Sequence, residues 1–254
     1  MSDELLNRTA LVVEDDDDIR QLLVVTLRKS GFTVFETASG HVGLDLVREH
    51  HPDLITLDLN LPDLDGVEVC RQARAISNAY IVMVTARQDE IDRLIGLEIG
   101  ADDFIGKPFS PRELSARVSA MFRRPRGGPP ASAPAVGNLP VVKPASARTL
   151  RHDGLIMDVD GRTVLMDGVE LAPTRIEFEL LEALMEAPHR VWSRDALLER
   201  VWGEGWSQDH HLVEVHIRNL RKKLGENIKD PRFIRTVRGV GYRMMPAPKG
   251  ESAG

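Results

Sequence analysis

The chain has 254 residues, of which 42% are apolar and 28% charged, and its formal net charge is -6. This length suits two domains with cores of their own, and the composition is typical of a soluble globular protein. No stretch approaches the roughly 20 consecutive apolar residues of a membrane span. The acidic start at residues 1–4 lacks the pattern of a secretory signal, so we expect a cytoplasmic protein. The single cysteine, Cys70, excludes an internal disulfide and favours a small packed apolar group.

Charge divides the chain into two unlike halves. Residues 1–124 contain 14 basic and 22 acidic residues, whereas residues 125–254 contain 19 basic and 17 acidic residues. Within the second half, residues 218–243 carry nine basic and two acidic groups. Such a block indicates either a surface that binds a polyanion or an ordinary solvated surface.

Between the halves, residues 125–150 are rich in Pro, Gly and Ala and have no helical or alternating pattern, which predicts a linker. We therefore expect a first domain at 1–124, a second at 151–246 and a flexible tail at 247–254. Because a proline-rich linker is extended and partly stiff, we expect the domains to be tethered without a fixed mutual orientation.

The first half alternates apolar runs with helical patterns. The runs predict buried strands at 11–13, 32–35, 54–57, 81–84 and 103–105. The helical patterns fall at 17–30, 40–50, 66–76, 88–99 and 111–123. This order predicts an α/β domain with a doubly wound, five-stranded parallel sheet.

Residues with reactive side chains follow or end four of these strands, and they are Glu14 and Asp15, Asp58, Thr85 and Lys107. The carboxyl ends of parallel strands meet at one edge of the sheet, so these side chains should converge. Three carboxylates about 4 Å apart would repel one another, and a divalent cation together with Lys107 would offset that repulsion. Magnesium prefers one or two carboxylates with water and phosphate oxygens, which leaves Asp58 as a nucleophile towards phosphorus.

Four motifs closely resemble the flavodoxin-like receiver domain of two-component response regulators. They are LVVEDD at 11–16, DLITLDLNLPDLDG at 53–66, IVMVTAR at 81–87 and ADDFIGKPFSPREL at 101–114. The resemblance implies that Asp58 accepts a phosphoryl group from a sensor histidine kinase. It also implies that Mg²⁺, or Mn²⁺ or Ca²⁺ in vitro, is held by Glu14, Asp15, Asp58 and the backbone carbonyl of Asn60.

The same resemblance assigns the remaining roles in this site. Lys107 would bind the phosphoryl group, Thr85 would be the switch hydroxyl, and Phe104, where Tyr is commoner, would be the switch aromatic. The Lys107-Pro108 peptide would be cis, which an X-Pro bond permits.

In regulators of the OmpR/PhoB kind, the helices expected at 88–99 and 111–123 form the face of an active homodimer. The charge pairs of that family are present as Arg93 with Glu113, Asp103 with Arg117, and Asp102 with Arg124, around an apolar patch of Leu94, Leu97 and Ala116. The alternative is a solvated charged face. Because exposed ion pairs contribute little individually, we expect the dimer to be weak before phosphorylation.

The second half predicts an α+β fold. Strand patterns at 155–159, 162–165 and 168–171 are separated by Asp-Gly turns, which is typical of a small antiparallel sheet. Helical patterns follow at 173–187, 193–201 and 209–224, and residues 233–243 predict a glycine-turned hairpin. Helices followed by a basic hairpin are the order of a winged helix-turn-helix.

The motifs LVEVHIRNLRKKLG at 212–225 and IRTVRGVGYR at 234–243 resemble the OmpR/PhoB DNA-binding domain. Val213, Ile217, Leu220 and Leu224 should face the core. The residues expected to contact promoter DNA are His216, Arg218, Asn219, Arg221 and Lys222 on the helix and Arg235, Thr236 and Arg238 on the hairpin. Asn219 stands where many relatives have Arg, which favours pairing with adenine. The loop at 202–207 would meet RNA polymerase.

These features predict a transcription regulator whose promoter binding is controlled by phosphorylation of Asp58. An aspartate-nucleophile phosphohydrolase is one alternative, but it commonly needs an acid two residues after the nucleophile, where Asn60 stands. We therefore expect no enzyme activity beyond the receiver's own phosphoryl transfer and dephosphorylation. A second alternative is a DNA-binding protein with a vestigial receiver. A calcium-binding loop at 63–66 is excluded, because this stretch lacks the acids that such a loop requires.

Overall fold

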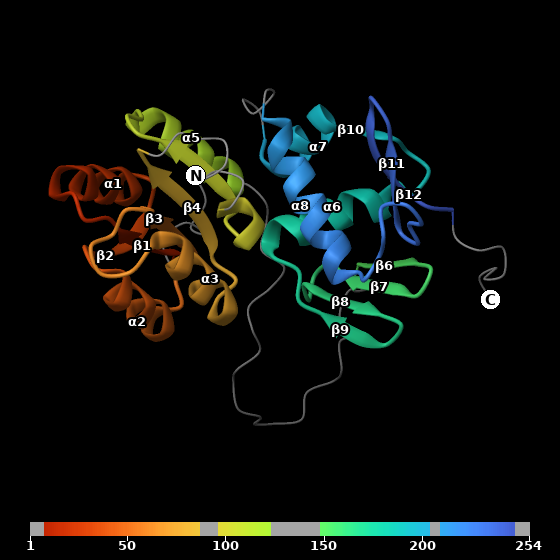
Figure 1. Cartoon of the computed structure of the whole chain (residues 1–254), viewed down its shortest axis with the longest axis horizontal. Coiled ribbons are helices and arrows are strands. Elements are labelled where there is room, and N and C mark those ends of the chain that lie inside the picture. The colour runs from red at the N-terminus through yellow and green to blue at the C-terminus, as the bar shows by residue number, and fades with distance from the viewer. Residues whose placement is uncertain (1–7, 87–95, 123–147, 204–208, 247–254) are drawn as a thin grey trace, which may run out of the picture.

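We describe a computed structural model of the chain. It describes residues 8–86, 96–122, 148–203 and 209–246. One group of elements, from β1 to α5, lies beside a second group, from β6 to β12 (Figure 1). No helix among the described residues is long and apolar enough to cross a membrane.

The first group is built around a parallel sheet of five strands with the order β2-β1-β3-β4-β5. The strands are β1 (Arg8–Val13), β2 (Phe32–Thr37), β3 (Leu54–Leu57), β4 (Tyr80–Thr85) and β5 (Asp103–Gly106). Every residue of β3 and β4 is buried, because helices cover both faces of the sheet. The predicted doubly wound sheet is confirmed.

The helices of this group begin where the sequence supplies capping side chains. They are α1 (Asp17–Lys29), α2 (Gly40–His50), α3 (Gly66–Ile76) and α5 (Pro111–Met121). The Asp16 carboxylate accepts hydrogen bonds from the backbone of Asp18 and Ile19, and the Ser110 hydroxyl accepts one from Glu113. Of the helix predicted over 88–99, residues 96–99 are described and are helical.

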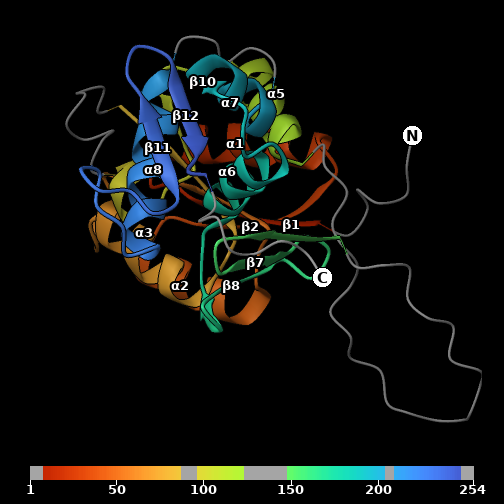
Figure 2. The same ribbon diagram turned by 90° about the vertical axis from the view of Figure 1, so that its right-hand side faces the viewer.

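The second group has two small antiparallel sheets, with α6 lying between them (Figures 1 and 2). The first sheet comprises β6 (Thr149–His152), β7 (Leu155–Asp158), β8 (Thr163–Met166) and β9 (Val169–Leu171). The predicted sheet is confirmed, but strand β6 was missed. Its signal was available, because Asp153 and Gly154, both with positive φ, form the same Asp-Gly turn that separates the later strands.

The remaining elements form the helix-turn-helix and its wing. They are α6 (Arg175–Glu186), β10 (Trp192–Ser193), α7 (Arg194–Val201), α8 (His210–Lys223), β11 (Ile234–Val237) and β12 (Gly241–Met244). The predicted helices and hairpin are confirmed, and β10 adds a third strand beside β12. The inward face of α8 is as predicted, with at most 3% exposure at Val213, Ile217, Leu220 and Leu224.

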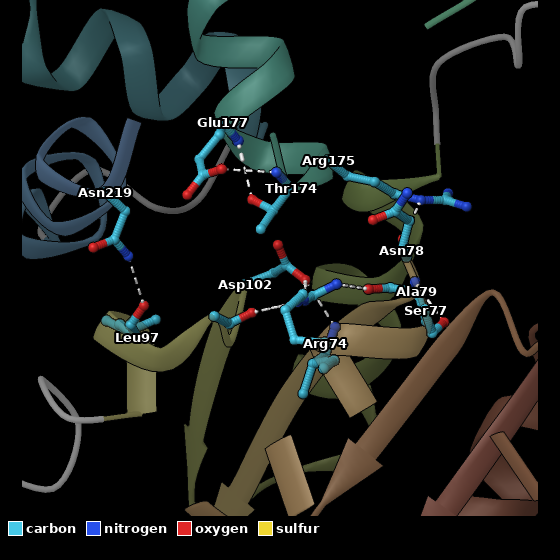
Figure 3. A network of polar contacts seen from close by, with 12 residues as sticks. Arg74, Ser77, Asn78, Ala79, Leu97, Asp102, Thr174, Arg175, Glu177 and Asn219 are labelled. Carbon is cyan, nitrogen blue, oxygen red and sulfur yellow. Dashed lines mark hydrogen bonds and ion pairs between the residues drawn. The ribbon is translucent and has the colours of Figure 1, made fainter. Parts of the chain in front are cut away.

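The two groups contact each other in this structure (Figure 3), whereas the composition of the linker predicted only a tether between them. The Tyr80 hydroxyl donates a hydrogen bond of 3.0 Å to Glu179 Oε1 of α6. The Arg175 guanidinium donates one of 2.7 Å to the carbonyl of Asn78 and also lies over the Tyr80 ring. The linker composition describes only the tether, whereas these contacts depend on domain surfaces that no local pattern encodes.

Candidate functional site

The reactive side chains converge at one edge of the parallel sheet. Glu14 and Asp15 follow β1, Asp58 follows β3, and Lys107 follows β5. One oxygen from each of the three acids lies within 4.8 Å of the others. The Arg20 guanidinium of α1, a residue missed by the sequence analysis, donates to the carbonyl of Glu14 at 2.9 Å and so positions the acidic turn.

Lys107 bridges the two buried acids. Its Nζ lies 2.7 Å from Glu14 Oε1 and 2.6 Å from Asp58 Oδ2. Burial lowers the pKa of Lys107, but the hydrogen bonds to Asp58 and Glu14 outweigh it and raise this pKa above its usual value. The ammonium group therefore stays charged and offsets part of the negative charge in the cluster.

Glu14 is fully buried, and this burial raises its pKa to about 7 although Lys107 opposes the shift. Its Oε1 is occupied by Lys107, whereas Oε2 is buried and has no hydrogen-bond partner among the described residues. A buried carboxylate oxygen without a partner is costly, and a hard cation would satisfy it. The donor set of Glu14, Asp15 and Asp58 therefore fits Mg²⁺.

The loop after Asp58 holds this carboxylate in place. Asp58 Oδ1 accepts a hydrogen bond of 3.2 Å from the backbone of Asn60. Asp15, Asn60 and residues 61–65 line a cavity of about 400 Å³ beside the cluster. A Cβ at Gly66 would lie 2.2 Å from the Asp58 carbonyl oxygen, so this close approach of α3 to the loop requires glycine.

Thr85 and Phe104, expected to respond to phosphorylation, lie on the neighbouring strands β4 and β5, with Phe104 level with Met83 and two residues before the edge. Thr85 ends β4 and is fully buried, and its carbonyl accepts a hydrogen bond of 2.8 Å from the Lys107 backbone. Phe104 on β5 is 6% exposed. The predicted cis peptide at Lys107-Pro108 is confirmed.

The expected dimer face is partly covered among the residues that the structure describes, with Glu113 and Arg117 half-buried. Leu97 and Asp103 are buried and only Ala116 is exposed, while Arg93, Leu94 and Arg124 lie outside the described residues. Arg117 lies 3.3 Å from Asp103 and 2.8 Å from Glu113 within the same chain.

Asp102 requires a correction, because its carboxylate is not presented at a surface. It is fully buried and lies 2.6 Å from Arg74 Nη2, and Asp102 Oδ2 also accepts a hydrogen bond from the backbone of Ile81. The Arg74 guanidinium is further fixed by the carbonyls of Ala79 and Gly100. Asp102 therefore ties α3 to β4 and β5, where we expected a pair with Arg124.

The residues expected to contact DNA divide into exposed and buried groups. Lys222, Arg235 and Arg238 are exposed, Thr236 is half-buried and the Arg218 side chain is 43% exposed. His216 and Asn219 are buried, with 0% and 7% exposure, so neither can reach DNA in this arrangement.

Arg221 also requires a correction, because its guanidinium is used inside the second group of elements. It donates hydrogen bonds to the Ile234 carbonyl at 2.8 Å and the Thr236 hydroxyl at 2.9 Å, and it pairs with Glu226 at 3.3 Å. Arg221 thus joins α8 to the wing and is not presented to DNA.

Each half of the chain matches a known protein family. Residues 10–119 match the family of the response regulator receiver domain, and residues 168–244 match the family described as transcriptional regulatory protein, C terminal. The chain is 40% identical to the DNA-binding response regulator MtrA of Mycolicibacterium smegmatis over 96% of this chain and 99% of that protein. It is 42% identical to the alkaline phosphatase synthesis transcriptional regulatory protein SphR of Synechococcus elongatus over 92% of this chain and 90% of that protein.

A solved structure of a RitR mutant covers 94% of this chain and 99% of its own, with a TM-score of 0.70 and 28% identity. The similarity in fold therefore includes both groups of elements. Together with the matched families and the acidic site at the sheet edge, these relatives show that the chain belongs to the OmpR/PhoB family of DNA-binding response regulators.

Proposed function

We propose that a sensor histidine kinase phosphorylates Asp58 and that this modification changes the affinity of the chain for promoter DNA. The observation that carries the proposal is the position of Asp58. Its carboxylate is 4% exposed, lies 2.6 Å from Lys107 and shares a cluster with Glu14 and Asp15. A nucleophilic carboxylate beside a cation is the arrangement that phosphoryl transfer needs.

In the transfer step, a carboxylate oxygen of Asp58 attacks the phosphorus of the kinase phosphohistidine. The new P–O bond forms as the P–N bond breaks, and the histidine leaves as imidazole, giving an acyl phosphate. Lys107, already beside Asp58, would pair with an oxygen of the incoming phosphoryl group. Bound Mg²⁺, held by Glu14, Asp15, Asp58 and the Asn60 carbonyl, would neutralise charge on the transferring oxygens. Attack of water on the phosphorus then breaks its bond to the Asp58 oxygen, releases inorganic phosphate and returns Asp58 to its carboxylate form.

The phosphoryl group adds a charge of about -1.5 to -2 next to buried groups, and this charge must be accommodated. Thr85 at the end of β4 would turn its hydroxyl towards the phosphoryl oxygens, and Phe104 would follow into the space that Thr85 leaves. These movements would reshape the surface around Ala116 and favour a homodimer of the receiver, taken as residues 1–124.

Two winged-helix domains, at 151–246 and joined by the linker at 125–150, would then occupy half-sites about one helical turn of DNA apart. Lys222, Arg235 and Arg238 are exposed and fit contacts to phosphates, whereas His216 and Asn219 fit base contacts once they are uncovered. The loop at 202–207, of which the structure describes residues 202 and 203, would face RNA polymerase in the cytoplasm.

The test uses acetyl phosphate with Mg²⁺, intact-protein mass spectrometry and fluorescence anisotropy on promoter DNA. We expect the wild-type chain to gain one phosphoryl group and to bind DNA more tightly, and Asp58→Asn to do neither. Affinity should fall as salt increases, because Lys and Arg contacts displace counterions. Equal DNA affinity with and without the donor, in a chain that is phosphorylated, would favour the vestigial receiver.

A further inference from the structure

The loop between β3 and α3, residues 59–65, forms one side of the expected metal site. It lines the cavity of about 400 Å³ beside the acidic cluster. The backbone N–H of Asn60 donates to Asp58 Oδ1 at 3.2 Å, and the Asn60 carbonyl is an expected ligand of the ion. The position of loop 59–65 therefore decides where this ligand lies relative to Glu14 and Asp15.

The two ends of the loop are held to each other and to α3. The backbone N–H of Gly66 donates to the carbonyl of Leu59 at 3.0 Å. Asp65 caps α3, because its Oδ1 accepts a hydrogen bond of 2.8 Å from the backbone N–H of Val67. These contacts close the base of the loop, whereas its middle is held by a different carboxylate.

Asp63, in the middle of the loop, binds the first turn of α2. Its Oδ2 accepts hydrogen bonds from the Ser39 hydroxyl at 2.6 Å and from the backbone N–H of His41 at 3.1 Å. Its Oδ1 accepts one of 2.9 Å from the backbone N–H of Gly40. One carboxylate therefore takes three donors from a helix that lies more than 20 residues earlier in the chain.

The helix α2 lacks an acid of its own at this end. Asp17 in α1, Glu68 in α3 and Glu113 in α5 supply a negative charge in the first turn, but the first turn of α2 has none. A carboxylate at a helix N-terminus satisfies free N–H groups and opposes the helix dipole. The hydrogen bonds from Ser39 and from the helix backbone hold the pKa of Asp63 well below its usual range, so it stays ionised although it is exposed.

Close apolar packing accompanies this polar contact. A Cβ at Gly40 would lie 2.8 Å from Val69 Cγ2 of α3, 3.2 Å from Leu64 Cβ and 3.3 Å from Leu61 Cδ1. Leu61 and Leu64 belong to the loop, and both pack against the hydrophobic core. The loop therefore lies directly on the first turn of α2, and a displacement of one would displace the other.

The turn before α2 connects this contact to the other acids of the site. The carbonyl of Thr37 accepts a hydrogen bond of 3.0 Å from the backbone N–H of Glu14, and the Thr37 hydroxyl accepts one of 3.1 Å from the backbone N–H of Ser39. Ser39 in turn donates to Asp63. A continuous series of hydrogen bonds thus runs from the backbone of Glu14 to loop 59–65.

We infer that Asp63 is a positioning residue of the metal site, which fixes loop 59–65 relative to Glu14 and Asp15 and makes the site select Mg²⁺ over Ca²⁺. Magnesium demands near-octahedral geometry at short distances, whereas calcium accepts six to eight oxygen ligands in flexible arrangements. A loop that is free to move would therefore weaken Mg²⁺ binding more than Ca²⁺ binding. The inference rests on the proposed function for the presence of an ion at this site.

The test compares three substitutions in the full chain. Asp63→Ala removes the carboxylate, and Asp63→Asn is the conservative variant, because it keeps one acceptor oxygen. Asp45→Ala is the matched control, since it removes an exposed carboxylate of α2 whose partner is Arg48 and not the loop. Calorimetry at pH 8, where Glu14 is mostly ionised, measures the Kd for Mg²⁺ and for Ca²⁺. Hydrogen exchange of the metal-free chain measures the mobility of residues 59–66.

We expect Asp63→Ala to raise the Kd for Mg²⁺ about five- to tenfold, at the low end of the cost of losing an outer partner of a metal ligand. The Kd for Ca²⁺ should rise about twofold or less, because its coordination is flexible. Asp63→Asn should lie between Asp63→Ala and the wild-type chain, and Asp45→Ala should match the wild-type chain. Amide exchange of residues 59–66 should be faster in Asp63→Ala than in Asp45→Ala.

Two results would overturn the inference. One is a ratio of Mg²⁺ to Ca²⁺ affinity in Asp63→Ala that equals the ratio in Asp45→Ala, which would mean that the carboxylate has only a general structural role. The other is unchanged exchange of residues 59–66 in Asp63→Ala. If the wild-type chain binds neither ion but exchange of the loop still increases in Asp63→Ala, the positioning of the loop by Asp63 is supported and the proposed metal site fails.

Discussion

The raised pKa of Glu14 predicts that magnesium binding depends on pH close to neutrality. Burial raises this pKa to about 7, with Lys107 opposing the shift. A metal ion binds the carboxylate form only, so protonation of Glu14 competes with the ion. The sign is therefore fixed: affinity for Mg²⁺ falls as the pH drops below 7.

The size of the effect follows from the titration of one group. With a pKa of about 7, Glu14 is about one-tenth protonated at pH 8 and about nine-tenths protonated at pH 6. The apparent Kd for Mg²⁺ should thus rise about tenfold between these pH values. Binding at pH 6 should release about one proton for each ion.

Isothermal titration calorimetry in buffers of different ionisation enthalpy measures both quantities. Glu14→Gln should bind Mg²⁺ more weakly and lose most of the pH dependence between pH 6 and 8, which separates Glu14 from the other acids of the cluster. A wild-type affinity that is flat over this range, or binding without proton release at pH 6, would refute the placing of Glu14 beside the ion.

Three further predictions concern other parts of the structure. Lys107→Met removes the ammonium that lies between Glu14 and Asp58, so we expect tighter Mg²⁺ binding together with slower phosphorylation by acetyl phosphate. If phosphorylation at saturating Mg²⁺ is slower but Mg²⁺ does not bind more tightly, the electrostatic argument is contradicted. Gly66→Ala places a Cβ 2.2 Å from the Asp58 carbonyl, and urea unfolding should show a loss of about 1–3 kcal/mol, whereas unchanged stability would show that the loop can move away. Burial lowers the pKa of His216. Asp102 and Glu177 oppose this shift and Arg74 adds to it, so the folded chain holds the imidazole neutral. The stability that depends on neutral His216 is present above the usual pKa of 6.5 and is lost as the pH falls below it, so urea unfolding should show a loss of stability in acid for the wild-type chain and a smaller loss for His216→Phe.

The receiver fold and its site could be predicted from the sequence because each buried strand carries its own local signal and the same signal recurs along the chain. A buried parallel strand is marked by an apolar run such as 54–57, and its carboxyl end must lie at the common edge of the sheet. Asp58, Glu14 and Lys107 were therefore brought together by topology alone. The same holds for α8, whose 3.6-residue period placed Val213 and Ile217 in the core.

Residues whose partners lie far away in the chain were not predicted. The pair of Asp103 with Arg117 was expected from the resemblance and is present, but nothing local says that Asp102, the residue before it, pairs with Arg74, 28 residues earlier. Arg221 has the same spacing as a groove-facing residue, yet Glu226 and the wing take its guanidinium. In both cases residue type and helical period were known, but the partner was set by tertiary packing.

Asn219 shows why a residue that is expected to read DNA is an ambiguous signal in a sequence. A side chain that reads a base must be polar and must find its partner only in the complex, so in the free protein it is either solvated or held by another group. Asn219 is held by another group, because its amide donates to the carbonyls of Leu97 and Glu98, which are acceptors like those of a base edge. Its oxygen remains without a partner, because the carbonyls of a helix end offer no donor, whereas an adenine offers a donor and an acceptor together. Under the proposed function, the Leu97 and Glu98 carbonyls would therefore satisfy only the donor half of the Asn219 amide, whereas an adenine would satisfy both halves.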